Sequence, residues 1–318
     1  MHNACESFRQ AVEDRLGYSP DDIEPGKLMR FATRDRRSDK AGWAKLFEDE
    51  RGGVFGCYRQ GISETWSAVE RQSMTTEERA AHDRQIAQAR AEREAQQRER
   101  WAENRLRIAK MWEASRPLVP GDPGTLYLKR RGLGGLWPLP QCLRLHRSLS
   151  YWEDGEEIGR FPTMVAPLVG ADGQMLALHR TFLTADGRKA DVPSPKKLTG
   201  AAGLLGGSCI PLHRPVRGSL GIAEGIETAI AAWAGSGVPV QAAYSGGNLA
   251  AWRWPEGLQR LVIFGDADDA GRKAAAELRA RAVRAGLRCE VLTPSDEGSD
   301  WCDVWAARRP ILLEGGVL

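Results

Sequence analysis

The stretch LVIFGDADDAGRKAAAELRARA, residues 261–282, decides the fold of the C-terminal third of the chain. It begins with an apolar run ending at Gly265, which is typical of a buried strand, and it continues from about Ala270 into a helical pattern. Three carboxylates, Asp266, Asp268 and Asp269, lie between the two. Carboxylates at a strand-to-helix junction are typical of the ligand-binding end of a parallel sheet.

The rest of residues 219–318 repeats this alternation of strand and helix. The predicted strands are SLGIA (219–223), VPVQAAY (238–244), LVIFG (261–265) and LRCEVLTP (287–294), and the predicted helices cover 227–234, a short segment through 251, and 270–285. Strands that alternate with helices predict an open, mainly parallel, Rossmann-like α/β sheet.

Acidic residues follow several of these strands. Glu224 comes directly after the strand at 219–223, and Asp266 and Asp268 follow the strand at 261–265. Because the carboxyl ends of parallel strands meet at one edge of a sheet, we expect these side chains to converge, with Asp300 and Asp303 of SDWCDVW at the same edge. Clustered oxygen ligands without Cys or His favour Mg²⁺ or Mn²⁺, and we expect no zinc.

A simpler interpretation competes for two of these residues. Asp is favoured at helix N-termini, so Asp268 and Asp269 could serve only to cap the helix that begins near Ala270. We favour that role for Asp269. Capping does not explain Glu224 or Asp266, which stand at strand ends.

The preceding segment, residues 116–218, is basic. It carries 14 Lys and Arg against 8 Asp and Glu, whereas residues 219–318 carry 10 against 13. TLYLKRRGL (125–133) predicts a helix ended by Gly132, and two apolar segments around the turn at 171–173 predict a hairpin. A basic block beside an acidic one suits a polyanion next to metal ions.

The N-terminal part divides into a small β-rich module, residues 1–72, and a charged helical connector, residues 73–115. We expect a helix from Glu6 to Leu16, short strands within 28–68, and one long helix that docks at its C-terminal end and is polar all round in its first half. Aromatic residues interleave with Lys and Arg in the module. They either stack nucleic-acid bases or form the only core of the module.

The C-terminal motifs resemble those of the Toprim domain, which is shared by DnaG-type primases, topoisomerases and certain nucleases. The match rests on AEGIETA, FGDADDAGRKAA and SDWCDVW over about residues 218–306. The resemblance implies that Glu224, Asp266 and Asp268 are catalytic and bind metal, with Asp300 and Asp303 as outer ligands. Many primases carry a second carboxylate four residues after the Glu, and here that position is Thr228, with Glu227 beside it.

The basic block resembles the catalytic core of primases, especially those encoded by phages, plasmids and other mobile elements. YLKRRGL is similar to the opening helix of that core, and QMLALHRTFL followed by PSPKKLTG is similar to its nucleotide-contacting strand and loop. The resemblance implies an α+β primase-core-like domain at 116–218 before a Toprim domain at 219–318. It implies that the residues contacting nucleotide or template are Arg180, Lys196, Lys197, Arg130 and Arg131.

These resemblances imply a DNA primase, a nucleotidyltransferase that makes short RNA on single-stranded DNA from nucleoside triphosphates. A Toprim nuclease and a non-catalytic single-strand-binding accessory protein are the alternatives. The six scattered cysteines contain no C-x-x-C pair, so the zinc ribbon that usually opens such primases is missing. We expect a separately encoded helicase or replication initiator as partner. Without a secretory signal or a long apolar run, we expect a cytoplasmic protein with no membrane partner.

Overall fold

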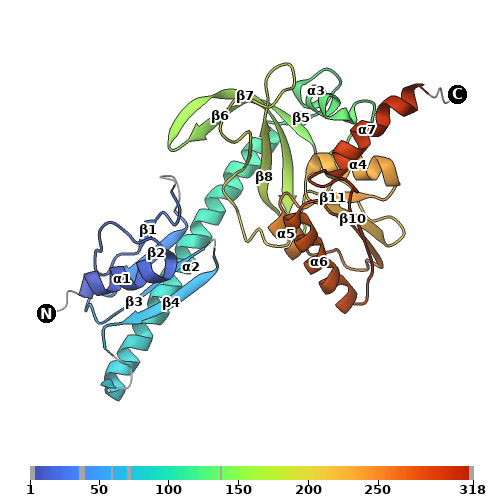
Figure 1. Ribbon diagram of the computed structural model, residues 1–318. Coiled ribbons are helices and arrows are strands. Elements are labelled where there is room, and N and C mark those ends of the chain that lie inside the picture. The colour runs from blue at the N-terminus through green and yellow to red at the C-terminus, as the bar shows by residue number, and fades with distance from the viewer. Residues whose placement is uncertain (1–3, 36–39, 59, 70–72, 137, 315–318) are drawn as a thin grey trace. The chain divides into compact units, whose positions relative to one another are not determined.

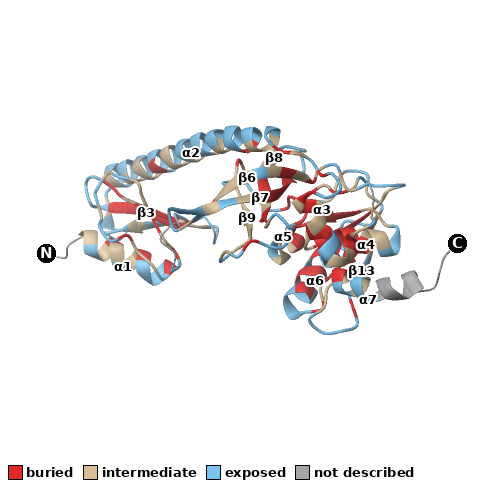
Figure 2. Cartoon of the chain, turned by 90° about the horizontal axis from the view of Figure 1, so that it is seen from above, coloured by how far each residue is buried: buried red, intermediate tan, exposed pale blue. Residues whose placement is uncertain are grey.

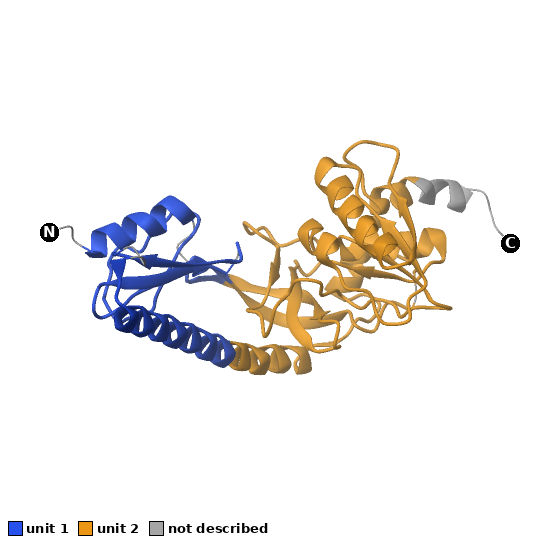
Figure 3. Cartoon of the chain, turned by 90° about the horizontal axis from the view of Figure 1, so that it is seen from below, with its two compact units in different colours: residues 1–100, 152–158 blue, residues 101–151, 159–318 orange. Residues whose placement is uncertain are grey.

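The computed structural model describes residues 4–35, 40–58, 60–69, 73–136 and 138–314. The chain forms two compact units (Figure 3). One contains residues 1–100 and 152–158, and the other contains residues 101–151 and 159–318.

The N-terminal unit is built on a four-stranded antiparallel sheet in sequence order, β1 (Met29–Phe31), β2 (Gly42–Leu46), β3 (Gly52–Cys57) and β4 (Ile62–Ser67). Helix α1 (Ala4–Leu16) places Phe8 and Val12 on one face of the sheet. The aromatic residues lie in the core: Phe31, Trp43, Phe47 and Phe55 are all buried. The core role of the interleaved aromatics is therefore the correct alternative for these four residues.

Helix α2 (Thr76–Glu113) begins with a capping box, because Thr75 and Glu78 exchange side-chain to backbone hydrogen bonds. Its last turns dock as predicted, with Ile108 packed against Leu178. Its first half is not polar all round, since Ala89 is buried against the N-terminal sheet. Figure 2 shows the remaining length of α2 largely exposed. Among the described helices none is both long and apolar enough to cross a bilayer.

The second unit opens with α3 (Pro123–Leu128) and a wider turn over Lys129–Leu133, where Gly132 adopts a φ of 80°, as a helix-ending glycine does. A five-stranded sheet follows in the order β5-β6-β7-β8-β9. The predicted hairpin is present as β7 (Glu156–Val169) paired antiparallel with β8 (Met175–Phe182). The remaining strands are β5 (Arg116–Pro117), β6 (Arg144–Glu153) and β9 (Lys196–Leu198).

The C-terminal part of this unit is the predicted parallel sheet, in the order β11-β10-β12-β13. Figure 1 shows β10 and β11 of this sheet beside helix α4. The strands are β10 (Ser219–Ala223), β11 (Val240–Ala242), β12 (Arg260–Phe264) and β13 (Arg288–Leu292). Helices α4 (Ile226–Ser236) and α7 (Trp301–Glu314) cover one face. Helices α5 (Gly246–Ala251) and α6 (Asp269–Arg284) cover the other. The mixed α/β architecture predicted from the sequence is confirmed.

A short bridge joins the two sheets of this unit. Cys209 pairs with Val169 of β7, and its neighbour Ile210 pairs with Ala242 of β11. All four backbone hydrogen bonds of these bridges lie between 2.7 and 3.2 Å. Cys209 and Ile210 thus form a two-residue connection that fixes the five-stranded sheet against the parallel sheet.

Candidate functional site

Five acidic residues gather at the carboxyl ends of the parallel strands. The register that pairs Ala223 with Phe264 sets the ends of β10 and β12 side by side, so Glu224 and Asp266 leave the sheet at the same edge. Asp268 follows at the start of α6, and Asp300 and Asp303 stand at the start of α7. We call Glu224, Asp266, Asp268, Asp300 and Asp303 the carboxylate edge. The predicted convergence of Glu224 with Asp266 is confirmed.

Asp266 has a strongly shifted pKa and a buried carboxylate oxygen. Its Oδ1 atom is buried and has no hydrogen-bond partner among the described residues. Burial, and after it the neighbouring charges of Glu224 and Asp300, raise the pKa of Asp266 to about 7. An ionised carboxylate that is buried without a partner is unstable, and a divalent cation is the kind of group that offsets this cost.

Two glycines allow this close packing. A Cβ atom at Gly271 would lie 2.7 Å from the backbone oxygen of Asp266, so only glycine lets the start of α6 approach that strand end. The backbone N–H of Gly246 donates to the Glu224 carboxylate. Burial and the charge of Asp268 nevertheless raise the pKa of Glu224. Tyr244, just before this loop, has a φ of 66°, which is rare for a bulky side chain.

Asp268, not Asp269, caps helix α6. The helix begins at Asp269, one residue earlier than predicted, so Asp268 occupies the N-cap position and accepts a hydrogen bond from Gly271 N at 2.6 Å. Asp269 is fully exposed and forms an ion pair with Arg272 at 2.9 Å. The N-cap role favoured for Asp269 is therefore wrong, because an extra residue joins the helix at its start.

Asp300 and Asp303 also have structural partners. The backbone N–H of Asp303 donates to Asp300 Oδ1 at 2.9 Å, and the backbone N–H of Asp300 donates to Asp303 Oδ2 at 3.2 Å. The two side chains thus cap the start of α7 reciprocally. Asp300 Oδ2 lies 3.9 Å from the Arg131 guanidinium.

The described residues contain no group of three or more His, Cys, Asp or Glu side chains that could hold one metal ion as they stand. Uncompensated carboxylates repel one another, and Asp268, Asp300 and Asp303 are engaged as helix caps. The donor chemistry, hard oxygen atoms around the partnerless Oδ1 of Asp266, nonetheless fits Mg²⁺ or Mn²⁺.

A buried carboxylate beside this edge, Glu227, organises the basic side of the site. It accepts hydrogen bonds from the Tyr127 hydroxyl and from Lys196 Nζ, the latter at 3.0 Å. Sequence reasoning noted Glu227 only as a neighbour of Thr228 and gave it no role. The signal was available: Glu227 is the one charged residue in the otherwise apolar helix IETAIAAWAGS.

The basic residues expected to contact nucleotide or template lie on two faces of the β8–β9 pair. Arg180 is opposite Lys197 in the register, whereas Lys196 is opposite Thr181, so Arg180 and Lys196 point to opposite faces. Arg180 donates to the Leu198 carbonyl at 2.7 Å. The Nζ atom of Lys197 lies 3.9 Å from the centre of the Tyr151 ring. Only Lys196 faces Glu227.

The two arginines of YLKRRGL also diverge. Arg130 donates to the backbone and carboxylate oxygens of Asp186, both at 3.0 Å. Arg131 lies beside Asp300 of the carboxylate edge. Together with Lys196, Arg131 brings positive charge from the basic segment to the carboxylate edge.

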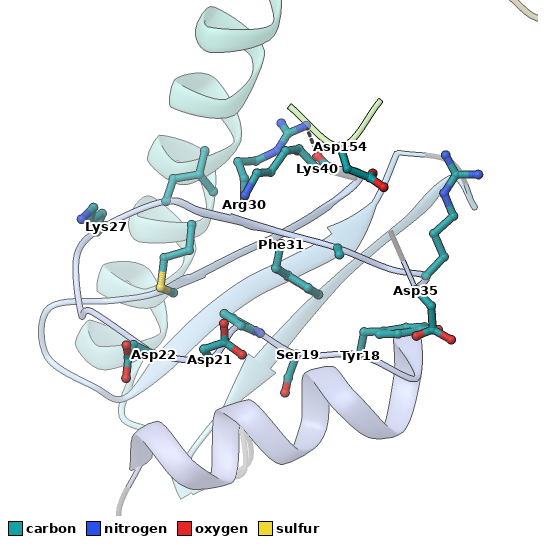
Figure 4. Close-up of a pocket in the computed structure, with 15 residues that line it drawn as sticks. Tyr18, Ser19, Asp21, Asp22, Lys27, Arg30, Phe31, Asp35, Lys40 and Asp154 are labelled. Carbon is teal, nitrogen blue, oxygen red and sulfur yellow. Dashed lines mark hydrogen bonds between the residues drawn. The ribbon is translucent and has the colours of Figure 1, made fainter. Parts of the chain in front are cut away.

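The N-terminal unit contains a hollow of about 940 Å³ (Figure 4). Its lining mixes the cations Lys27, Arg30, Arg34 and Lys40 with the anions Asp21, Asp22, Asp35 and Asp154. Arg30 Nε donates to the Lys40 carbonyl at 2.9 Å. A hollow lined by both signs of charge offers no net attraction to a polyanion, so the carboxylate edge is the stronger candidate site.

Comparisons with known families cover the second unit. Residues 219–310 match the model of the Toprim domain, and residues 102–210 match a domain of unknown function, DUF7146. No match was found among curated proteins.

Solved structures similar to the chain include three primases. The Aquifex aeolicus primase, with its zinc-binding and RNA polymerase domains, is 14% identical, with 99% of this chain and 86% of that one covered and a TM-score of 0.40. A DNA primase domain from Pseudomonas aeruginosa is 18% identical over 53% of this chain, with a TM-score of 0.34. The primase fragment of the bacteriophage T7 primase-helicase is 17% identical over 55% of this chain and 67% of that one, with a TM-score of 0.34.

The chain spans 56% of the Pseudomonas domain. The sheet topology, the acidic strand ends and the family match agree over the same residues. The parallel sheet and its helices, residues 219–310, are a Toprim domain.

Proposed function

We propose that the chain is a DNA primase that joins nucleotides from nucleoside triphosphates into short primers on single-stranded DNA, with Mg²⁺ or Mn²⁺ held at the carboxylate edge. The observation that carries the proposal is the partnerless, buried Oδ1 of Asp266 in a Toprim domain. The adjoining segment brings the cation Lys196 to the same place.

Each residue of the site has a part in the proposed reaction. Glu224, Asp266 and Asp268 hold the metal, whose charge stabilises developing negative charge on phosphate oxygens when it is bound. Lys196 offsets phosphate charge, and Arg131 adds positive charge beside Asp300. Arg180 and Lys197, on the opposite face of β8–β9, contact template. A helicase or replication initiator is the proposed protein partner.

The test is label incorporation from nucleoside triphosphates on mixed-sequence single-stranded DNA with Mg²⁺ or Mn²⁺. Asp266→Asn is compared with Asp269→Asn, a matched control because Asp269 is exposed and paired with Arg272. We expect short products from wild type and the control, and a loss of about 10³-fold in Asp266→Asn. End-labelled DNA and RNA are followed in parallel. Their shortening without incorporation would establish a nuclease, and neither activity with intact DNA binding would leave an accessory protein.

A further inference from the structure

Glu227 lies where three segments of the second unit meet. It belongs to the first turn of α4 in the Toprim domain, and the residue as a whole is buried. One carboxylate oxygen accepts from Tyr127 of α3, and the other accepts from Lys196 of β9. Both carboxylate oxygens of Glu227 are therefore committed to residues of the basic segment.

The two partners of the ion pair between Glu227 and Lys196 differ in their exposure to solvent. The Glu227 side chain is 5% exposed, whereas the Lys196 side chain is 38% exposed. A lysine ammonium has three N–H donors, and one of them is used by Glu227. The remaining donors can bind another acceptor without breaking the pair.

The charge of Lys196 reaches the carboxylate edge. It lowers the pKa of Glu224, partly offsetting the effects of burial and of Asp268. It also lowers the pKa of buried His179, after the larger effect of burial. Lys196 is thus held at the first turn of α4, which closely follows Glu224 of the carboxylate edge.

The Glu227 carboxylate is kept in its ionised form. Burial alone raises the pKa of Glu227, but Lys196 and the Tyr127 hydroxyl outweigh it and bring the pKa to about 2. A buried carboxylate kept ionised in this way holds its cation firmly, because separating the pair would leave an uncompensated buried charge.

We propose that Glu227 is a positioning residue: it fixes the Lys196 ammonium beside the carboxylate edge, so that the remaining N–H groups of Lys196 bind the phosphates of the incoming nucleoside triphosphate. The inference rests on the proposed function for its substrate class. Glu227 thus holds Lys196 in place, although Glu227 is adjacent to the position where many primases carry a second carboxylate.

The experiment measures equilibrium binding of a non-hydrolysable ATP analogue with Mg²⁺, together with KM and kcat for nucleotide incorporation. Wild type is compared with Glu227→Gln, Lys196→Ala and the double variant. Glu290→Gln is the control, since Glu290 is an exposed Glu paired with Arg260. We expect Kd and KM to rise about tenfold in Glu227→Gln, with kcat within about twofold of wild type. The double variant should be no worse than Lys196→Ala, because both changes remove one interaction.

Thermal melting separates this role from a purely structural one, which would lower stability and leave Kd and KM unchanged. If Glu227→Gln does not fold, Tyr127→Phe removes one of the two hydrogen bonds to the carboxylate and should give a smaller rise in Kd. Unchanged Kd in a folded variant, or losses that add in the double variant, would overturn the inference. Wild type that binds the analogue without making primers would count against the proposed function alone. Wild type that does not bind it would overturn both.

Discussion

The sheet of the N-terminal unit and the carboxylate edge of the second unit differ in whether their polar side chains have interaction partners. On the N-terminal sheet Lys45 is paired with Glu92, and the Arg93 guanidinium lies 4.5 Å from the centre of the Trp43 ring. At the carboxylate edge Asp266 keeps a buried oxygen without a hydrogen-bond partner, alone among the carboxylates of the described residues.

This difference teaches where function can be recognised in a sequence. Interleaved aromatic and basic residues in the N-terminal module look like a nucleic-acid surface, yet they satisfy one another as core and as ion pairs. The buried Oδ1 of Asp266 has no such internal partner among the described residues, so it points to an external one. The four predictions below test this contrast, in descending order of expected effect.

The N-terminal aromatics should matter for folding more than for binding. Phe8 is 0% exposed and packs on Phe55 and Trp66, so Phe8→Ala should lower the free energy of unfolding by about 3–5 kcal/mol. Tyr58→Ala, at a side chain that is 38% exposed, should cost less than about 1 kcal/mol. Urea denaturation measures both. If Tyr58→Ala instead abolished single-strand binding, the module would have a second role.

Buried His179 should make the protein sensitive to acid. Burial, followed by the charge of Lys196, lowers the pKa of His179 to about 4, while Glu227 partly opposes the shift and Arg180 adds to it. The stabilising contribution is complete above the ordinary pKa of about 6.5 and is lost as the pH falls towards 4, by about 3 kcal/mol. Urea denaturation across this range measures the slope.

The urea denaturation is measured in protein that carries Asp266→Asn. The raised pKa of Asp266 makes metal-free protein less stable as the pH rises from about 4 to 7, which opposes the effect of His179. Adding His179→Asn to this variant should make the free energy of unfolding depend less on pH. An unchanged slope would contradict the assignment to His179.

Metal should stabilise the folded protein through the carboxylate edge. At about ten times its Kd, Mg²⁺ should add about 1.4 kcal/mol to the free energy of unfolding at pH 8. Asp266→Asn should remove this gain, and Asp269→Asn should keep it. Thermal melting with and without Mg²⁺ measures the effect. An equal gain in Asp266→Asn would place the metal elsewhere.

Asp268 should show two separable roles. Asp268→Ala removes the N-cap of α6 and should cost about 1 kcal/mol, whereas Asp268→Ser preserves the cap and should cost a few tenths. Both variants should lose the Mg²⁺-dependent gain, because both lack the carboxylate. A metal response in Asp268→Ser equal to that of wild type would reduce Asp268 to a cap.

The fold of residues 219–318 could be predicted because strand and helix periods alternate there without interruption, and the strand ends carry the acids. The direction of each side chain could not. Arg180 and Lys196 look like partners in sequence, but the pairing register of β8 and β9 sends them to opposite faces. The cap at Asp268 depended on one extra residue in α6, which propensity does not resolve.

Glu227 was missed for a related reason. A lone acid on an apolar helix predicts a buried partner, but the partners, Tyr127 and Lys196, are 100 and 31 residues away in the chain. Only the packing of α4 against the basic segment brings them together.

The bridge at Cys209 and Ile210 has a consequence for how the second unit opens. Since one dipeptide hydrogen-bonds to β7 on one side and to β11 on the other, neither sheet can detach without breaking it. The amides of Cys209 and Ile210 should therefore exchange with solvent only through unfolding of the whole unit and belong to its slowest-exchanging class. We therefore expect the five-stranded sheet and the Toprim domain to unfold together as one cooperative element.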